Sequence, residues 1–82
     1  MNAYEQLIDM LRKQARAGVL PSHIADMNIT SDMKLGDLGI DSLGKMGLLT
    51  GLMELTDQYF PDDAFNDNQT LQEVAGIISR NM

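Results

Sequence analysis

The sequence contains no cysteine, no tryptophan and a single histidine, His23. Without cysteine there are no disulfides, thiolate metal sites or cysteine nucleophiles, so any thiol chemistry must come from an attached group. One histidine supplies few metal ligands, and no carboxylate spacing of the EF-hand type occurs. We therefore expect no metal site.

Basic clusters and long apolar runs are also missing. The chain has 12 acidic and 6 basic side chains, a net charge of −6. Such a chain repels nucleic acid and anionic membranes and attracts basic protein surfaces. No apolar run approaches the roughly 20 residues that span a bilayer, and the N-terminus lacks the pattern of a signal peptide. We expect a cytoplasmic monomer whose partners are proteins, with no nucleic acid and no membrane among them.

The apolar periodicity predicts helices over residues 3–17 and 42–56 and a last helix that begins at Thr70. Eighty-two residues form one domain, 1–82, with one core and no room for a deep enclosed cavity. A short helix is predicted to begin at Pro61, because proline is common at the first helical position. No alternating pattern is long enough to indicate a sheet. The fold class is therefore all-α, a small bundle of three main helices plus one short helix.

A long loop over residues 19–41 separates the first two predicted helices, and residues 21–26 within it suit a short helical turn. Loops of this length in compact domains are usually functional. Scattered apolar residues should hold it against the core, so we expect it to be ordered. These residues are Leu20, Ile24, Met27, Ile29, Leu35, Leu38 and Ile40.

The second predicted helix contains three glycines, Gly44, Gly47 and Gly51. Each costs about 1 kcal/mol relative to alanine in a helix interior. Either tertiary packing stabilises this helix, or a partner uses its bare backbone for close approach.

The stretch Leu35-Gly36-Asp37-Leu38-Gly39-Ile40-Asp41-Ser42-Leu43 places a serine hydroxyl at the start of the second helix. The first turn of a helix has unpaired N–H groups and the positive end of the dipole, which suits a phosphate. Ser42 can therefore carry a phosphodiester, or it can be a plain N-cap. Asp41 can be a cap residue, orient a reacting hydroxyl or coordinate a divalent ion in a partner's active site, and Leu43 offers an apolar contact.

This stretch resembles the attachment motif of acyl carrier proteins and the related peptidyl carrier domains, in which a leucine-glycine pair precedes Asp-Ser-Leu. The resemblance covers essentially the whole chain. It implies a non-catalytic carrier on which a phosphopantetheinyl transferase moves 4′-phosphopantetheine from coenzyme A to Ser42. The thiol of that arm would hold cargo as a thioester and present it to acyl-transferring, ligase or synthase enzymes. The acidic composition favours an acyl carrier of fatty acid, polyketide or other specialised biosynthesis over an aminoacyl or peptidyl carrier.

Many acyl carrier proteins continue after Asp-Ser-Leu with acids that basic partner enzymes bind, whereas this sequence reads Gly44-Lys45-Met46-Gly47. Our hypothesis is a specialised carrier whose interface consists of Leu43, Met46 and bare glycine backbone more than of salt bridges. The residues expected to recognise partners are Asp37, Lys45, Met46 and Glu54.

Two other functions are compatible with some of these residues. One is an unmodified acidic helical adaptor that binds a basic protein partner. The other is a hydrolase with Ser42, His23 and Asp26 as nucleophile, base and orienting acid. The nucleophile elbow requires glycine two residues before the serine, where Ile40 stands, so we predict that the protein is not an enzyme.

Overall fold

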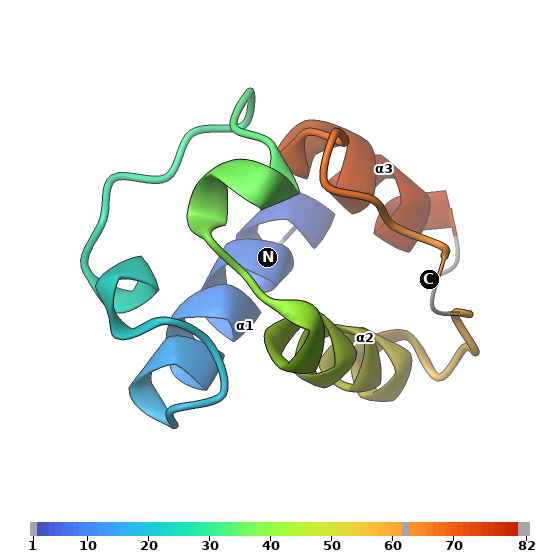
Figure 1. Ribbon diagram of the computed structural model, residues 1–82. Helices are drawn as coiled ribbons and strands as arrows, with labels where there is room; N and C mark the ends of the chain where they lie inside the picture. The colour runs from blue at the N-terminus through green and yellow to red at the C-terminus, as the bar shows by residue number, and fades with distance from the viewer. Residues whose placement is uncertain (1, 62, 81–82) are drawn as a thin grey trace.

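Three α-helices surround a shared core in the computed structural model, which describes residues 2–61 and 63–80 (Figure 1). They are α1 (Ala3–Arg16), α2 (Ser42–Thr56) and α3 (Leu71–Arg80). The described residues contain no strand, only an isolated bridge between Lys34 and Thr70. The all-α fold class and the three main helices are thus confirmed. None of the helices in the described part of the chain is long and apolar enough to cross a membrane.

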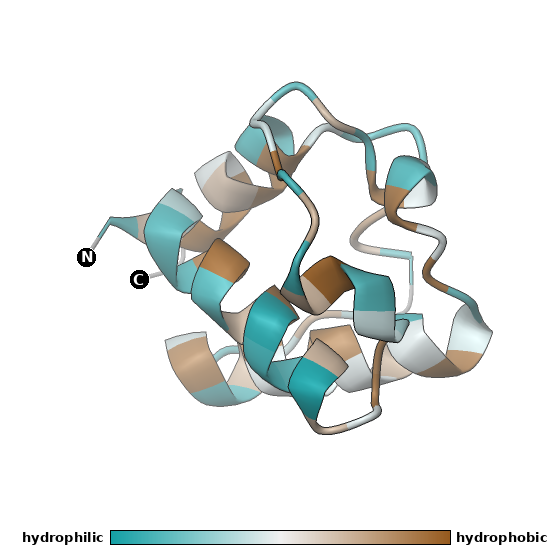
Figure 2. Ribbon diagram, turned by 90° about the vertical axis from the view of Figure 1, so that its left-hand side faces the viewer, coloured by the Kyte–Doolittle hydropathy of each residue, from teal (hydrophilic) through white to brown (hydrophobic). Residues whose placement is uncertain are grey.

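The core takes side chains from all three helices and from the loop between α1 and α2. Apolar residues at helical spacing give α1 its buried stripe of Leu7, Leu11 and Ala15. In Figure 2 hydrophobic residues recur along the loop as well as along the helices. The remaining buried apolar residues are Leu20, Ile24, Leu35, Leu38, Leu48, Leu49, Leu52, Phe60, Phe65, Leu71, Val74, Ala75 and Ile78.

The loop before α2 contains two short 3₁₀ helices, η1 (Ser22–Ala25) and η2 (Leu35–Leu38). Arg12 of α1 holds the first part of the loop, because one guanidinium nitrogen donates to the carbonyl oxygens of Ile24, Ala25 and Met27 at 3.0–3.3 Å. Together with the buried leucines and Ile24, these bonds order the loop as predicted and confirm the short helical turn.

The connection from α2 to α3 turns between two buried phenylalanines. Phe60 and Phe65 pack with their ring centroids 5.4 Å apart. Between them the amide of Ala64 donates to the carbonyl of Pro61 at 3.0 Å. The described residues 57–61 and 63–70 form turns and no helix, and residue 62 of the predicted short helix lies outside the described residues. The predicted short helix is thus absent from the described residues of this connection.

The capping box predicted at the start of α3 is present. The Thr70 hydroxyl accepts from the amide of Glu73 at 3.1 Å, and the Glu73 carboxylate accepts from the amide of Thr70 at 3.1 Å. Such a box satisfies two amides that otherwise lack intrahelical partners.

Two of the α2 glycines pack against α1 and the residues that follow it. A Cβ built at Gly51 would lie 2.7 Å from Nε2 of Gln14, and one at Gly47 would collide with Val19. The Gln14 amide also donates to the carbonyl of Gly47 at 2.9 Å. Tertiary packing therefore uses these glycines to bring α2 close to α1, which offsets their low helix propensity.

Candidate functional site

Ser42 is the first residue of α2, and Asp41 before it is the N-cap. The Asp41 backbone is extended, and its carboxylate accepts from the amide of Gly44 at 2.8 Å. The Ser42 side chain is exposed, and its hydroxyl has no hydrogen-bond partner within residues 2–61 and 63–80. The interpretation of Ser42 as a plain N-cap is therefore wrong, because the neighbouring aspartate performs that role.

The loop delivers Ser42 to the surface through η2 and a left-handed glycine. Leu35 and Leu38 are buried on η2, and the chain then reverses at Gly39, whose φ is +73°. A side chain at this φ would be strained, so glycine suits the position. Asp37 caps the start of η2, because its carboxylate accepts from the amide of the N-cap residue Lys34 at 3.0 Å. Asp37 is exposed and serves loop structure in addition to any contact with a partner.

Gly44 permits the loop and α2 to meet at the base of the site. It is buried, and a Cβ built on it would lie 3.0 Å from both Leu20 and Ile40 and 3.3 Å from the Asp41 carboxylate. The hypothesis that bare glycine backbone forms a partner surface is therefore wrong for Gly44. Its missing side chain is a requirement of internal packing.

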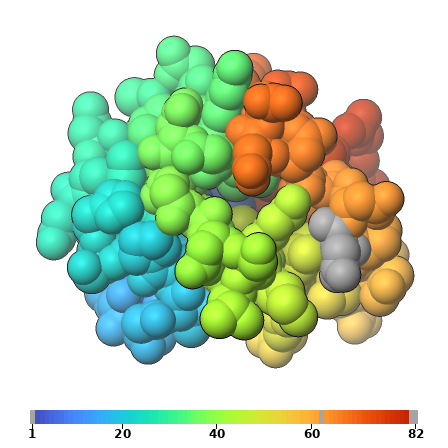
Figure 3. Space-filling view, viewed as in Figure 1, coloured from blue at the N-terminus to red at the C-terminus, as the bar shows by residue number. Residues whose placement is uncertain are grey.

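The surface next to Ser42 is apolar, with one cation. Leu43 is 77% exposed and Met46 is 58% exposed. An open hollow of about 220 Å³ is lined by Ser42, Lys45, Met46 and Leu49. Figure 3 shows the start of α2 at the surface, with a depression between it, the preceding loop and the orange segment that leads to α3. Lys45 and Asp67 are among the residues that line a second, smaller hollow.

The structure brings together only some of the site residues predicted from the sequence. Ser42, Lys45 and Met46 share one hollow. Glu54 is exposed but lies twelve residues further along α2, about 18 Å from Ser42 at 1.5 Å per residue. Leu49 was not predicted as a site residue, although its position seven residues after Ser42 places it on the same face of the helix.

His23 is engaged elsewhere than at Ser42. Its Nε2 lies 3.0 Å from the carbonyl oxygen of Leu38. A carbonyl only accepts, so this nitrogen carries a proton and donates. The imidazole thus connects η1 to η2 and serves the loop, and the geometry offers no support for a hydrolase triad.

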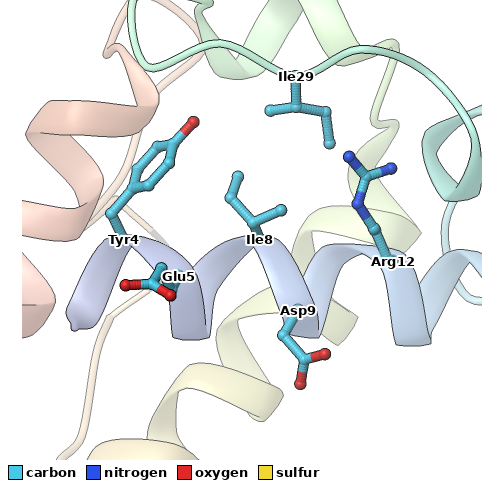
Figure 4. Close-up of a pocket in the computed structure, with 6 residues that line it drawn as sticks. All are labelled: Tyr4, Glu5, Ile8, Asp9, Arg12 and Ile29. Carbon is cyan, nitrogen blue, oxygen red and sulfur yellow. The ribbon is translucent and has the colours of Figure 1, made fainter. Parts of the chain in front are cut away.

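A groove of about 340 Å³ lies away from Ser42, between α1 and the loop. In Figure 4 Tyr4, Ile8 and Arg12 point from α1 toward Ile29, whereas Asp9 points away. The residues that line the groove are Tyr4, Glu5, Ile8, Asp9, Arg12 and Ile29. Because Arg12 is bonded to loop carbonyls there, we interpret this groove as part of the attachment of the loop. Among the described residues no group of three or more histidine and acidic side chains is placed to hold a metal ion.

Residues 17–78 match the model of a protein family described as the phosphopantetheine attachment site. The match covers well over half of the chain and includes the loop, Asp41, Ser42 and α2. No curated protein and no solved structure is significantly similar to the chain. Domains of this family bear a covalent 4′-phosphopantetheine group, are carriers rather than enzymes, and work with a phosphopantetheinyl transferase and biosynthetic enzymes. The chain therefore belongs to the phosphopantetheine attachment-site family and is a phosphopantetheine carrier protein.

Proposed function

We propose that Ser42 is the residue that bears the phosphopantetheine arm. Three serines, Ser22, Ser31 and Ser42, lie within the matched residues. Ser22 begins a 3₁₀ helix of four residues and Ser31 lies in a turn, whereas Ser42 begins an α-helix of fifteen. Only a long α-helix presents a substantial positive dipole end and several aligned amides to a phosphate. The observation that carries the proposal is the exposed Ser42 hydroxyl at that helix end, which has no hydrogen-bond partner among the described residues.

The residues around Ser42 fit a phosphopantetheine group. Its hydroxyl is free to form the phosphodiester, and the amides of Ser42 and Leu43 have no partner inside the helix. Lys45 supplies a positive charge on the same side of α2, and Met46 and Leu49 supply an apolar wall. When bound, the group supplies the thiol that the cysteine-free chain lacks and that holds cargo as a thioester.

Asp41 and Leu43 have separate tasks in this proposal. Asp41 fixes the first turn of α2 by capping Gly44, and its exposed carboxylate is available to the transferase that modifies the neighbouring serine. Leu43 is the most exposed large apolar side chain beside Ser42 and makes contact with the transferase and with later enzymes. Burial of such a side chain in an interface contributes about 1.5–3 kcal/mol.

We propose acyl groups as the cargo and a dedicated biosynthetic pathway as the setting. The hollow beside Ser42 is walled by Met46 and Leu49, which suits an apolar chain better than a charged aminoacyl group. Between Ser42 and Met53 the only charged residue of α2 is Lys45. Partner enzymes that dock on this part of α2 therefore need an apolar surface more than a basic one.

Incubation with coenzyme A and a broad-specificity phosphopantetheinyl transferase, followed by intact mass spectrometry, tests the attachment. We expect the wild type to gain the mass of one phosphopantetheine group. Ser22→Ala, the matched control, should gain the same mass, and Ser42→Ala should gain none. A gain that survives Ser42→Ala would contradict the proposed site. No gain in the wild type would instead favour the unmodified acidic adaptor.

The cargo is tested on protein isolated from its own cells. The mass of the group released from the thiol by mild hydroxylamine identifies it. An apolar acyl group would support the proposal, and an amino acid or a peptide would show an aminoacyl or peptidyl carrier instead.

A further inference from the structure

Lys45 lies on the same side of α2 as Ser42. The two residues are three positions apart, and at that spacing Cβ atoms on a helix are about 5–6 Å apart. Both line the hollow that also contains Met46 and Leu49. Lys45 is thus placed to reach any group attached to the Ser42 hydroxyl.

The ammonium group of Lys45 has no ion-pair partner among residues 2–61 and 63–80, where the one ion pair joins Lys13 and Asp9 at 2.9 Å. In the described part of the chain the same holds for the other basic side chains, apart from Lys13. Of the nearby acids, Asp41 accepts from the amide of Gly44 through one carboxylate oxygen and forms no ion pair with Lys45. Asp67 lines the smaller hollow together with Lys45 but forms no ion pair with it.

The side chain of Lys45 borders a hollow whose other walls are mainly apolar. The residue is partly buried, and Leu35, Ile40 and Leu48 line the hollow that it borders. A lysine whose methylene groups pack on apolar neighbours keeps its charge in water and loses less side-chain entropy when it forms an ion pair. An ion pair of the half-buried Lys45 therefore costs less side-chain entropy than one of a fully exposed lysine.

We propose that Lys45 is a positioning residue for the phosphodiester of the arm. This inference rests on the proposed attachment at Ser42. The ammonium group donates to a phosphodiester oxygen in a charge-assisted hydrogen bond. The bond directs the first part of the arm along the hollow toward Met46 and Leu49. In this role Lys45 acts on the arm itself, in addition to the contact with partners predicted from the sequence.

A four-protein cycle tests the inference through stability. The melting temperature is measured for the apo- and holo-forms of the wild type and of Lys45→Met at low salt, after intact mass has verified each holo-protein. We expect attachment of the arm to raise the melting temperature of the wild type more, or to lower it less, than that of Lys45→Met. The expected difference is about 1–8 °C, as for an exposed ion pair in a domain of this size.

Three controls separate an ion pair from a general effect of charge. Lys13→Met removes the same charge from α1 and should show the same change on modification as the wild type. Lys45→Arg should keep the wild-type difference, and 1 M NaCl should abolish it through screening. Compared with the holo wild type, the ³¹P chemical shift of the phosphodiester should change in holo Lys45→Met and stay the same in holo Lys13→Met.

The role of Lys45 would be overturned if modification changed the melting temperature equally in the wild type, Lys45→Met and Lys13→Met. An unchanged ³¹P chemical shift in Lys45→Met would overturn it as well. If Lys45→Met does not fold, Lys45→Gln takes its place with the same expectations. A missing mass gain in the wild type would contradict the attachment itself, and with it this inference, whereas a modified protein without coupling contradicts only the role of Lys45.

Discussion

Two helical glycines, Gly44 in α2 and Gly76 in α3, should respond in opposite directions to the same substitution. Gly76 is exposed, and a Cβ built on it has no neighbour within 4 Å. Gly44 is buried, and its Cβ would lie 3.0 Å from Leu20 and Ile40. Alanine adds one methyl group in each case, but only at Gly44 must it displace packed atoms.

The size of each effect follows from these surroundings. Gly76→Ala should stabilise the protein by about 1 kcal/mol through helix propensity, which raises the melting temperature by about 4–8 °C. Gly44→Ala gains the same ~1 kcal/mol but loses about 1–3 kcal/mol to overpacking. Because the new methyl also crowds the Asp41 carboxylate at 3.3 Å, a further loss of about 0.5–2 kcal/mol from the weakened cap is expected. The net loss is about 0.5–4 kcal/mol.

Thermal and urea unfolding followed by circular dichroism measure both changes against the wild type. We expect Gly76→Ala to melt above the wild type and Gly44→Ala below it. If Gly44→Ala were stabilised as much as Gly76→Ala, Gly44 would not be needed for packing. Its absent side chain would then have to be explained by a partner surface, as the sequence first suggested.

Substitutions at three further residues test other parts of the structure. Asp41→Asn should keep the N-cap of α2 and the wild-type stability, whereas Asp41→Ala should lose about 1 kcal/mol in urea unfolding; equal stability of the two variants would contradict the capping role. Arg12→Met should cost about 1.5–3 kcal/mol and increase amide exchange in residues 24–27, because three loop carbonyls lose their donor; unchanged exchange there would show that apolar packing alone orders the loop. Thr70→Ala should cost about 1 kcal/mol by removing half of the capping box, and a wild-type melting temperature would refute this.

Local signals in the sequence were sufficient to predict the three α-helices α1, α2 and α3. Periodic apolar residues and a terminal glycine predicted the end of α1 to within one residue. The glycine, Gly18, adopts a left-handed φ of +85° just after the helix, as is common at helix ends. The capping box likewise located the start of α3. These features depend on residues three or four positions apart, which the sequence displays directly.

Features that depend on distant residues were not predictable in the same way. The close neighbours of Gly44 include Leu20, which is 24 positions earlier in the chain. Similarly, Phe60 and Phe65 anchor a turn where the proline and acids around Pro61 indicated a short helix. In both places tertiary packing determines the conformation, and a single sequence does not show which residues will pack together.

In the candidate site, too, local features were predictable from the sequence and features that depend on distant residues were not. The motif around Ser42 was readable from the sequence because it is contiguous. The assignment of the N-cap to Asp41 was left open, because the sequence alone does not decide between two adjacent capping residues. The hollow that Ser42 shares with Lys45 and Leu49 could be identified only from the structure, where α2 lies against the loop.

The most direct measurement is peptide mapping by tandem mass spectrometry of the protein isolated from its own cells. We expect the phosphopantetheine group on the peptide that contains Ser42, and on the hydroxyl of that residue. A group located on Ser22 or Ser31, or a Ser42 peptide that is unmodified throughout a functional preparation, would contradict the proposal that Ser42 carries the arm.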